Sequence, residues 1–189
     1  MVKETENMLI KTLLKRRSIR AYENRLVESE KIERILQAAL LSPSSKGIRP
    51  CSFVLVEDPE LLQALSKSKP HGAGFIGGAA FAIVVCADVD AAAAWIEDCS
   101  IAAINIQLAM EEDGLGSCWV QIRERKAPDG SGASEYIKQL LDIPANYEVE
   151  AVISAGYPAE QKEPNSIQSL QWQKVFRNKF GRTYRAYRK

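Results

Sequence analysis

The sequence has few of the residues that metal sites and hydrolytic triads require. Histidine occurs once, as His71, so a Ser-His-Asp triad would have to use it, and no G-x-S-x-G elbow accompanies it. None of the four cysteines forms a C-x-x-C pair, which argues against a zinc site or a thioredoxin-like motif. We therefore expect no metal site and no catalytic side chain. We interpret His71 as a loop residue, with contact to a substrate as the alternative.

Long apolar runs and a charge excess are also missing. The longest apolar stretch, residues 79–87, is far too short to cross a bilayer, and the net charge of +1 recruits neither nucleic acid nor an anionic membrane. The first residues, MVKETENMLIKTLLKRR, mix acids and bases without a signal-peptide core. We expect a cytoplasmic protein with no nucleic-acid or membrane partner.

Hydrophobic patterning predicts helices followed by strands that alternate with helices. Helices are expected over residues 4–17, 30–41, 59–67, 91–113 and 134–141, with Ser29, Asp58 and Ser134 as N-caps and Gly114 as a stop. Strands are expected over residues 53–56, 81–87, 117–122 and 149–155. This order predicts an α+β or α/β three-layer arrangement, a single domain over residues 1–189 with a basic C-terminal arm from about residue 168.

The helix expected over residues 91–113 is apolar on nearly every side from Cys99 to Met110. Such a helix is expected to be buried all round, which a single small domain seldom achieves. A dimer interface would supply the missing cover, and a well-wrapped monomer core is the alternative. We interpret Cys86 and Cys99 as small core residues.

Two weaker signals admit ordinary explanations. Gly72 to Gly77 matches G-x-G-x-x-G, but a polar loop precedes it and a strand follows, which reverses the order of a dinucleotide fingerprint. We interpret it as a flexible loop that could cover a pocket. The tail over residues 177–189 interleaves bases with aromatics, as in some single-strand nucleic-acid binders. A solvated arm, or an arm that wraps a partner subunit, explains it equally.

A basic segment lies where the first helix should stop. Arg16, Arg17 and Arg20 flank Ser18, and arginine forks together with a hydroxyl match phosphate oxygens. If the segment is extended, alternate residues Arg16, Ser18 and Arg20 face one ligand. The other interpretation is a solvated helix end, where cations suit the helix dipole. Spacing alone does not separate the two.

Three further segments join this one in a fixed order: residues 42–50 (SPSSKGIRP), residues 114–121 (GLGSCWVQ) and residues 153–158 (ISAGYP). The set resembles the nitroreductase family of flavoproteins, which has R-R-S-x-R, P-S-x-x-x-x-Q-P, G-L-G-[ST]-x-W and G-Y-P segments in this order. The resemblance covers residues 16–158, most of the chain.

The resemblance implies an α+β nitroreductase-like three-layer sandwich with a central, mostly antiparallel sheet. It implies an intertwined homodimer with FMN at the interface. NADH or NADPH would give hydride to flavin N5, and a nitroaromatic, quinone or similar acceptor would then take it in a ping-pong cycle. Alternatives are an enone or halogenated phenol as acceptor, or a protein that binds FMN without turnover. A small nucleic-acid-binding protein is an alternative of another class.

The resemblance also assigns cofactor-binding residues by position. Arg16 and Ser18 would meet the FMN phosphate beside Arg17, and Arg20 would reach the pyrimidine side of the flavin. Residues 119–121 would lie along the isoalloxazine, with a backbone N–H near N5. The remaining contacts would come from the other subunit's loop and from a C-terminal basic residue: Pro43, Ser44, Ser45 and Lys174, with Arg177 and Lys179 as alternatives to Lys174.

The chain departs from the family pattern at two places. Arg49, Pro50 and Cys51 stand where the family has Q-P-W, and the family's asparagine in this loop falls near Gly47. Both departures lie near the expected flavin edge. They bear on substrate preference more than on FMN binding.

Overall fold

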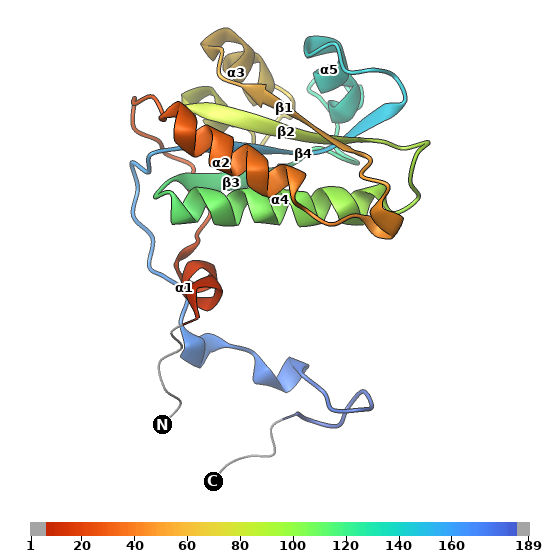
Figure 1. The fold of residues 1–189 in the computed structure, drawn as a ribbon. Helices are drawn as coiled ribbons and strands as arrows, with labels where there is room; N and C mark the ends of the chain where they lie inside the picture. The colour runs from red at the N-terminus through yellow and green to blue at the C-terminus, as the bar shows by residue number, and fades with distance from the viewer. Residues whose placement is uncertain (1–6, 185–189) are drawn as a thin grey trace. The chain divides into compact units, whose positions relative to one another are not determined.

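A four-stranded antiparallel sheet organises residues 16–162 in the computed structural model, which describes residues 7–184 (Figure 1). The strands follow the order β1-β2-β4-β3. All four expected strands are confirmed, and the bounds are β1 Cys51–Val56, β2 Phe81–Asp88, β3 Gly116–Gln121 and β4 Tyr147–Gly156.

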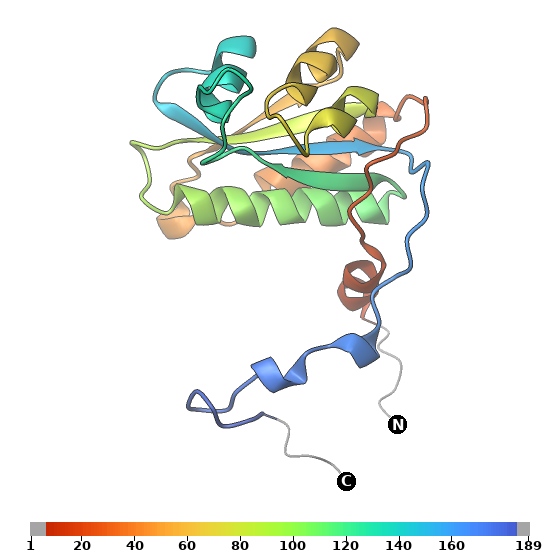
Figure 2. The ribbon, with the colours of Figure 1, turned by 180° about the vertical axis from the view of Figure 1, so that it is seen from behind.

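Helices cover both faces of the sheet, which confirms the three-layer α+β expectation. Helices α2 (Ser29–Leu40) and α4 (Trp95–Glu112) lie on one face, and α3 (Pro59–Ser66) and α5 (Ala133–Leu140) lie on the other (Figures 1 and 2). Strand β2 is central, and its side chains alternate between the two apolar layers. Every residue from Phe81 to Ala87 is buried, as a continuous apolar run predicts.

Local capping signals were only partly correct. Asp58 caps α3 by accepting from the N–H groups of Glu60 and Leu61, and Gly114 ends α4 with a φ of +75°. Ser29 and Ser134 are not N-caps. Ser29 is already helical, and Ser134 lies inside α5, where its hydroxyl donates to a carboxylate oxygen of Glu148 at 2.6 Å. The Ser134 hydroxyl therefore binds a side chain of β4 and does not cap the helix, contrary to the prediction from the local sequence pattern.

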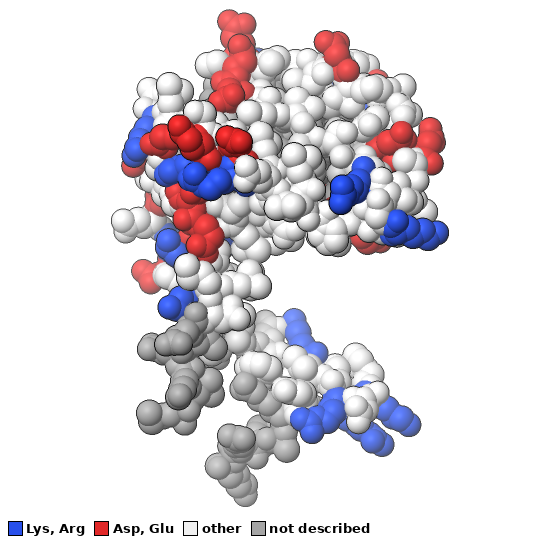
Figure 3. Space-filling model, in the orientation of Figure 1, with Lys and Arg blue, Asp and Glu red and all other residues white. Residues whose placement is uncertain are grey.

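Helix α4 is not enclosed on all sides within one chain, which goes against the alternative of a well-wrapped monomer core. One side packs on the sheet through Cys99, Ala103 and Ile106, which are fully buried. On another side Ile101 and Ile104 are 39% and 36% exposed. At the end of α2, Leu40 is 68% exposed. Figure 3 shows this side of the molecule, and the middle of the surface over α2 and α4 carries few charged side chains.

Residues 1–15 and 163–189 form a second structural unit. Its helix α1 covers Met8–Lys15, shorter than expected; positions 4–6 lie outside the described residues. The unit also contains the 3₁₀ turns Ile167–Ser169 and Trp172–Lys174. Within the described part of this unit Thr12 is the only buried residue. Most of its larger apolar side chains are exposed, namely Met8, Leu9, Ile10, Leu13, Ile167, Leu170, Val175 and Phe180.

Candidate functional site

The basic segment runs in extended form along the outer edge of β3. The Ile19 N–H donates to the Ser117 carbonyl at 2.9 Å, and Ser18 forms a parallel bridge with Ser117. Gly116 permits this approach, because a Cβ there would lie 2.7 Å from a Ile19 methyl carbon. The expected alternation of Arg16, Ser18 and Arg20 along an extended segment therefore holds for the backbone.

Two residues after β4 fasten this segment from the other side. The Lys162 ammonium donates to the Ser18 carbonyl at 2.6 Å, and the Glu160 carboxylate accepts from the Arg20 N–H. Lys162 and Glu160 also form an ion pair of 3.3 Å. Neither residue belongs to a sequence motif, and only the folded chain brings them to the basic segment. The sequence alone therefore did not indicate them.

Positive charge gathers around the start of β3. Burial raises the pKa of the Cys118 thiol, while Arg20, a hydrogen bond with Ser18, and the charges of Lys162 and Arg16 all act to lower it. Within residues 7–184 no ion pair involves the Arg16 or Arg20 side chain, although Lys162 is paired. Two unneutralised guanidinium groups beside a strand edge make this region a candidate anion site.

A fourth cation, Lys69, interacts electrostatically with Cys118 in the same region. Burial lowers the pKa of Lys69, the nearby Arg125 lowers it further, and Cys118 opposes both. Lys69 is part of the polar stretch before the glycine-rich loop, and the sequence alone gave no reason to select it. Its position adds to the positive potential at the start of β3.

The glycine-rich loop lies against the basic segment. Residues Gly74–Gly78 form a 3₁₀ turn. The local structure, like the reversed order of loop and strand, therefore excludes a dinucleotide-binding fingerprint here. The Arg20 guanidinium carbon lies 5.7 Å from the centre of the Phe75 ring, a cation–π distance. His71 is exposed. Closure of this loop over a ligand stays a prediction.

The outer edge of β3 presents backbone donors. Since the Ser117 carbonyl points away from β4 toward Ile19, the strand period of two makes the N–H groups of Trp119 and Gln121 point outward as well. Val120 is the intervening residue, with a buried side chain. The Gln121 side chain is occupied, because it accepts from the Trp119 indole at 3.0 Å and donates to Glu150 at 3.1 Å. Residues 119–121 thus offer backbone groups at this edge.

The loop before β1 has a defined shape. The Ser45 N–H donates to Asp98 at 2.8 Å, and the Ser44 hydroxyl accepts from the Arg49 N–H at 2.8 Å. Lys46 and Arg49 have φ values of 53° and 55°, a left-handed conformation that these hydrogen bonds hold in place. Pro43 is exposed. Asp98 is buried at the start of α4, and nothing in its sequence pattern indicated this role.

The structure does not bring this loop to the basic segment of the same chain. Register places Cys51, which follows the loop, opposite Ala87, whereas Ser117 pairs with Ala155 and Ala155 with Phe81. The two segments therefore lie about 20 Å apart along the strands and about 19 Å apart across the sheet, since the basic segment lies one spacing beyond β3. They lie at opposite ends of the sheet in Figure 1. Lys174 belongs to the second structural unit, where its side chain is exposed.

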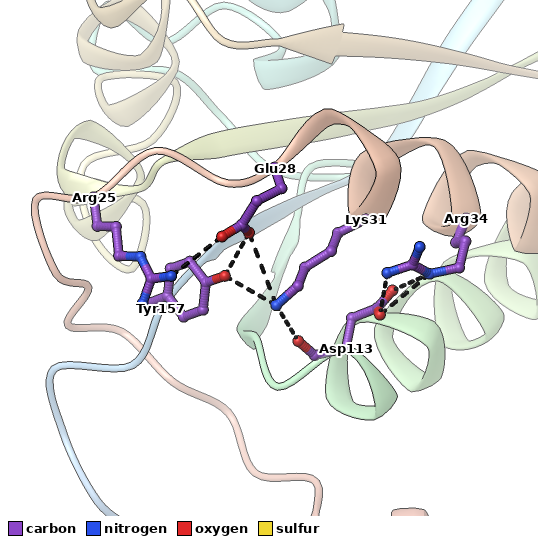
Figure 4. A network of polar contacts seen from close by, with 6 residues as sticks. All are labelled: Arg25, Glu28, Lys31, Arg34, Asp113 and Tyr157. Atoms are coloured by element: carbon purple, nitrogen blue, oxygen red, sulfur yellow. Dashed lines mark hydrogen bonds and ion pairs between the residues drawn. The ribbon is translucent and has the colours of Figure 1, made fainter.

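The G-Y-P segment holds a polar network (Figure 4). The Tyr157 hydroxyl donates to Glu28 at 2.5 Å and accepts from Lys31 at 2.9 Å, and the Arg25 guanidinium lies 3.7 Å from the centre of the Tyr157 ring. Arg34 and Lys31 both reach Asp113, at 2.7 Å through its carboxylate and at 2.9 Å through its carbonyl. This motif fastens the start of α2 to the ends of β4 and α4.

No helix over residues 7–184 combines the length and the apolar character that a membrane span needs. In the same part of the chain no three His, Cys, Asp or Glu side chains are grouped as metal ligands.

Comparisons with known proteins agree on one family. The profile of the nitroreductase family matches residues 13–69 and 67–157. A solved FMN-dependent nitroreductase from Clostridium difficile is 47% identical, with a TM-score of 0.89 over 90% of this chain and 99% of that one. A protein of Archaeoglobus fulgidus, whose name pairs NADH dehydrogenase with NAD(P)H nitroreductase, is 38% identical over 82% of this chain and 87% of its own length. The NADPH:FMN oxidoreductase of Vibrio harveyi, solved with NAD⁺, is 25% identical, with a TM-score of 0.77 over 92% of this chain and 78% of that one.

Proposed function

Because the chain belongs to the nitroreductase family, we propose that it is an FMN-dependent oxidoreductase that moves electrons from NADH or NADPH to an oxidised acceptor. Nitroaromatics and quinones are the proposed acceptor class. The names of the relatives, which include an FMN-dependent nitroreductase and an NADPH:FMN oxidoreductase, support flavin chemistry with a pyridine nucleotide donor. The observation that carries the proposal for this chain is the pair of unneutralised arginines, Arg16 and Arg20, beside the outward-facing edge of β3.

The residues at this edge fit FMN. Bound FMN would supply the redox chemistry by accepting hydride at N5 and passing it to the acceptor. Arg16 and Ser18, with Arg17 beside them, would hold the phosphate by charge-assisted hydrogen bonds. Arg20 would face the pyrimidine side, where its fixed positive charge favours the negative charge of the reduced flavin. An outward N–H of Trp119 or Gln121 would donate toward N5, and Val120 would hold the strand in place from the core.

We further propose that two chains complete each site. The loop with Pro43, Ser44 and Ser45 lies too far from Arg16 of its own chain for one flavin to touch both. A second copy packed on the sparsely charged middle of the surface over α2 and α4 would bring its loop to this chain's β3 edge. It would also cover Ile101, Ile104 and Leu40, which a single chain leaves exposed.

The second structural unit fits the same proposal. Its apolar side chains lack a core of their own in the described residues, so an arm of this kind gains stability by packing on a partner subunit. Lys174 belongs to this arm and is proposed to approach the FMN phosphate from there. Arg177 and Lys179 are the alternatives in the same arm.

The spectrum of the purified chain tests the cofactor and the donor. We expect flavin absorbance in the visible range that bleaches when NADH or NADPH is added without oxygen. Reoxidation by a panel of nitroaromatics, quinones, enones and halogenated phenols would then identify the acceptor class. A colourless protein that does not take up added FMN would refute the proposal. A flavin that stays oxidised when either nucleotide is added would support the alternative, a protein that binds FMN without turnover.

Complementation between two variants with damaged FMN binding tests the shared site. Arg16→Ala damages one half of the proposed site, and Ser45→Glu places a bulky carboxylate in the other while keeping the Ser45 N–H bond to Asp98. After the two variants are unfolded and refolded together, about a quarter of the sites should be intact, because half of the dimers are mixed and each has one undamaged site. A double variant refolded with itself is the control. No recovery in the mixture would show that each site belongs to one chain.

A further inference from the structure

Two cysteines that are not among the proposed FMN-binding residues form a close pair. Cys51 opens β1 and Cys99 lies in the second turn of α4, and their sulfurs are 3.5 Å apart. A disulfide needs a separation of about 2.05 Å, so the sulfurs must approach by about 1.5 Å. Rotation of the two side chains, which belong to adjacent layers of the fold, can supply a movement of this size.

The two thiols differ in exposure and acidity. Cys51 is half-buried and can be reached by a small solute, whereas Cys99 is 0% exposed. The hydrogen bond from Cys99 lowers the pKa of the Cys51 thiol, against the effects of burial and of the Asp98 charge. The same hydrogen bond and burial raise the pKa of Cys99. Cys51 is therefore the thiol that reacts first, and Cys99 is placed to attack it afterwards.

We propose that Cys51 and Cys99 are a peroxide-sensitive dithiol that closes to a reversible disulfide. The Cys51 thiolate attacks one oxygen of hydrogen peroxide, the O–O bond breaks, and hydroxide leaves and takes up a proton to form water. The Cys99 thiol then attacks the resulting sulfenic sulfur and releases a second water. In sum, two thiols and one peroxide give one disulfide and two waters, with two electrons passing from sulfur to oxygen.

The pair is coupled to the loop that precedes β1. Asp98, the neighbour of Cys99, holds the Ser45 N–H, and Cys51 follows Arg49 and Pro50 directly. A disulfide would link the end of this loop covalently to α4. The remaining cysteines are poorer candidates, since burial raises the pKa of Cys86 to about 11 and also raises that of Cys118.

Thiol mapping on the purified full-length chain tests the proposal. Graded hydrogen peroxide should remove two of the four free thiols, and peptide mapping without reductant should find Cys51 joined to Cys99 within one chain. Dithiothreitol should restore both thiols. Cys86→Ala is the matched control and should leave the cross-link unchanged.

Variants of the pair test the order of events. Cys99→Ala should leave Cys51 as a sulfenic acid that dimedone traps, and Cys51→Ala should leave Cys99 unmodified at the same peroxide exposure. The proposal is overturned if the wild-type chain keeps both thiols while other residues oxidise, or if Cys51 joins another chain. Because thiol mapping does not depend on flavin content or turnover, its failure is distinguishable from failure of the proposed function.

Discussion

Two basic regions of this chain differ in whether their charges are neutralised. Arg25, Lys31 and Arg34 each contact a carboxylate, and two of them also contact the Tyr157 ring. Arg16 and Arg20 have no ion pair within the described residues, and their charges act with that of Lys162 to lower the pKa of Cys118, which in turn acts on Lys69. In the first region every cation named has a counter-charge within the chain, and in the second Arg16 and Arg20 have none among the described residues.

The contrast separates a structural role from a binding role. The network around Tyr157 joins α2, α4 and the end of β4, and each of its cations already has a carboxylate partner. Cations gathered without counter-charges repel one another and reduce stability. Such an arrangement is expected where an anionic ligand supplies the missing charge, which supports our proposal of the β3 edge as the binding region.

The largest effect is expected at Arg16. Arg16→Ala should weaken FMN binding about 10-fold to 100-fold, since a hydrogen bond to a charged group contributes about 1.5–3 kcal/mol. Titration of flavin-free protein with FMN, followed by flavin fluorescence, measures this. Arg34→Ala is the matched control, because it removes an arginine that is paired with Asp113. Equal losses of affinity in both variants would erase the distinction between the two regions.

Arg20 should act on the potential of the flavin as well as on its affinity. Arg20→Ala is expected to lower the two-electron reduction potential by about 30 mV, which corresponds to ~1.4 kcal/mol less stabilisation of the reduced form. Arg20→Lys should restore part of the shift, because it keeps the charge but loses the planar fork. Equilibration with a reference dye during stepwise reduction gives the potential. A wild-type potential and flavin content in Arg20→Ala would show that Arg20 does not face the flavin.

In the paired region the effect should fall on stability. Tyr157→Phe deletes the hydroxyl that joins Glu28 to Lys31 and should reduce the free energy of unfolding by about 1 kcal/mol. FMN affinity should not change. Urea unfolding followed by circular dichroism measures the loss, and a flavin titration of the same sample gives the second readout. A large loss of affinity without a loss of stability would assign the network to the binding site.

Sequence patterns predicted elements better than they predicted element ends. The short apolar run over residues 81–87 was predicted correctly, since a central strand covered on both faces buries every side chain. The Ser134 cap failed because a carboxylate of β4, distant in sequence order, offers its hydroxyl a better partner. For α4 the sequence predicted apolar surroundings on every side, supplied either by a dimer interface or by a well-wrapped monomer core. Ile101 and Ile104 stay partly exposed in one chain, which goes against the monomer core, and the dimer interface stays a prediction.

For the site, sequence motifs located the segments but not what holds them. The alternation of Arg16, Ser18 and Arg20 was predictable from an extended backbone. Lys162 and Asp98 were not, because each acts through a backbone group of a segment 144 or 53 residues away. Single charged residues outside motifs carry no such signal in one sequence.

The smallest expected effect is a pH dependence confined to the paired region. The hydrogen bond from Tyr157 is the main reason that the pKa of Glu28 falls from 4.5 to about 2, with Lys31 and Arg25 adding to it. Because the folded pKa is the lower one, the contribution of Glu28 is fully present above pH 4.5 and is lost as the pH falls toward 2.

Thermal unfolding across this range should therefore show the difference in Tm between wild type and Tyr157→Phe narrowing as the solution becomes more acidic. In a Glu28→Gln background the effect of Tyr157→Phe should not vary with pH, since no carboxylate remains at that position to titrate. If the difference in Tm stays constant in the wild-type background, the Tyr157 hydroxyl does not stabilise the Glu28 carboxylate, and the paired region depends instead on the stacking of Arg25 and on Arg34 with Asp113.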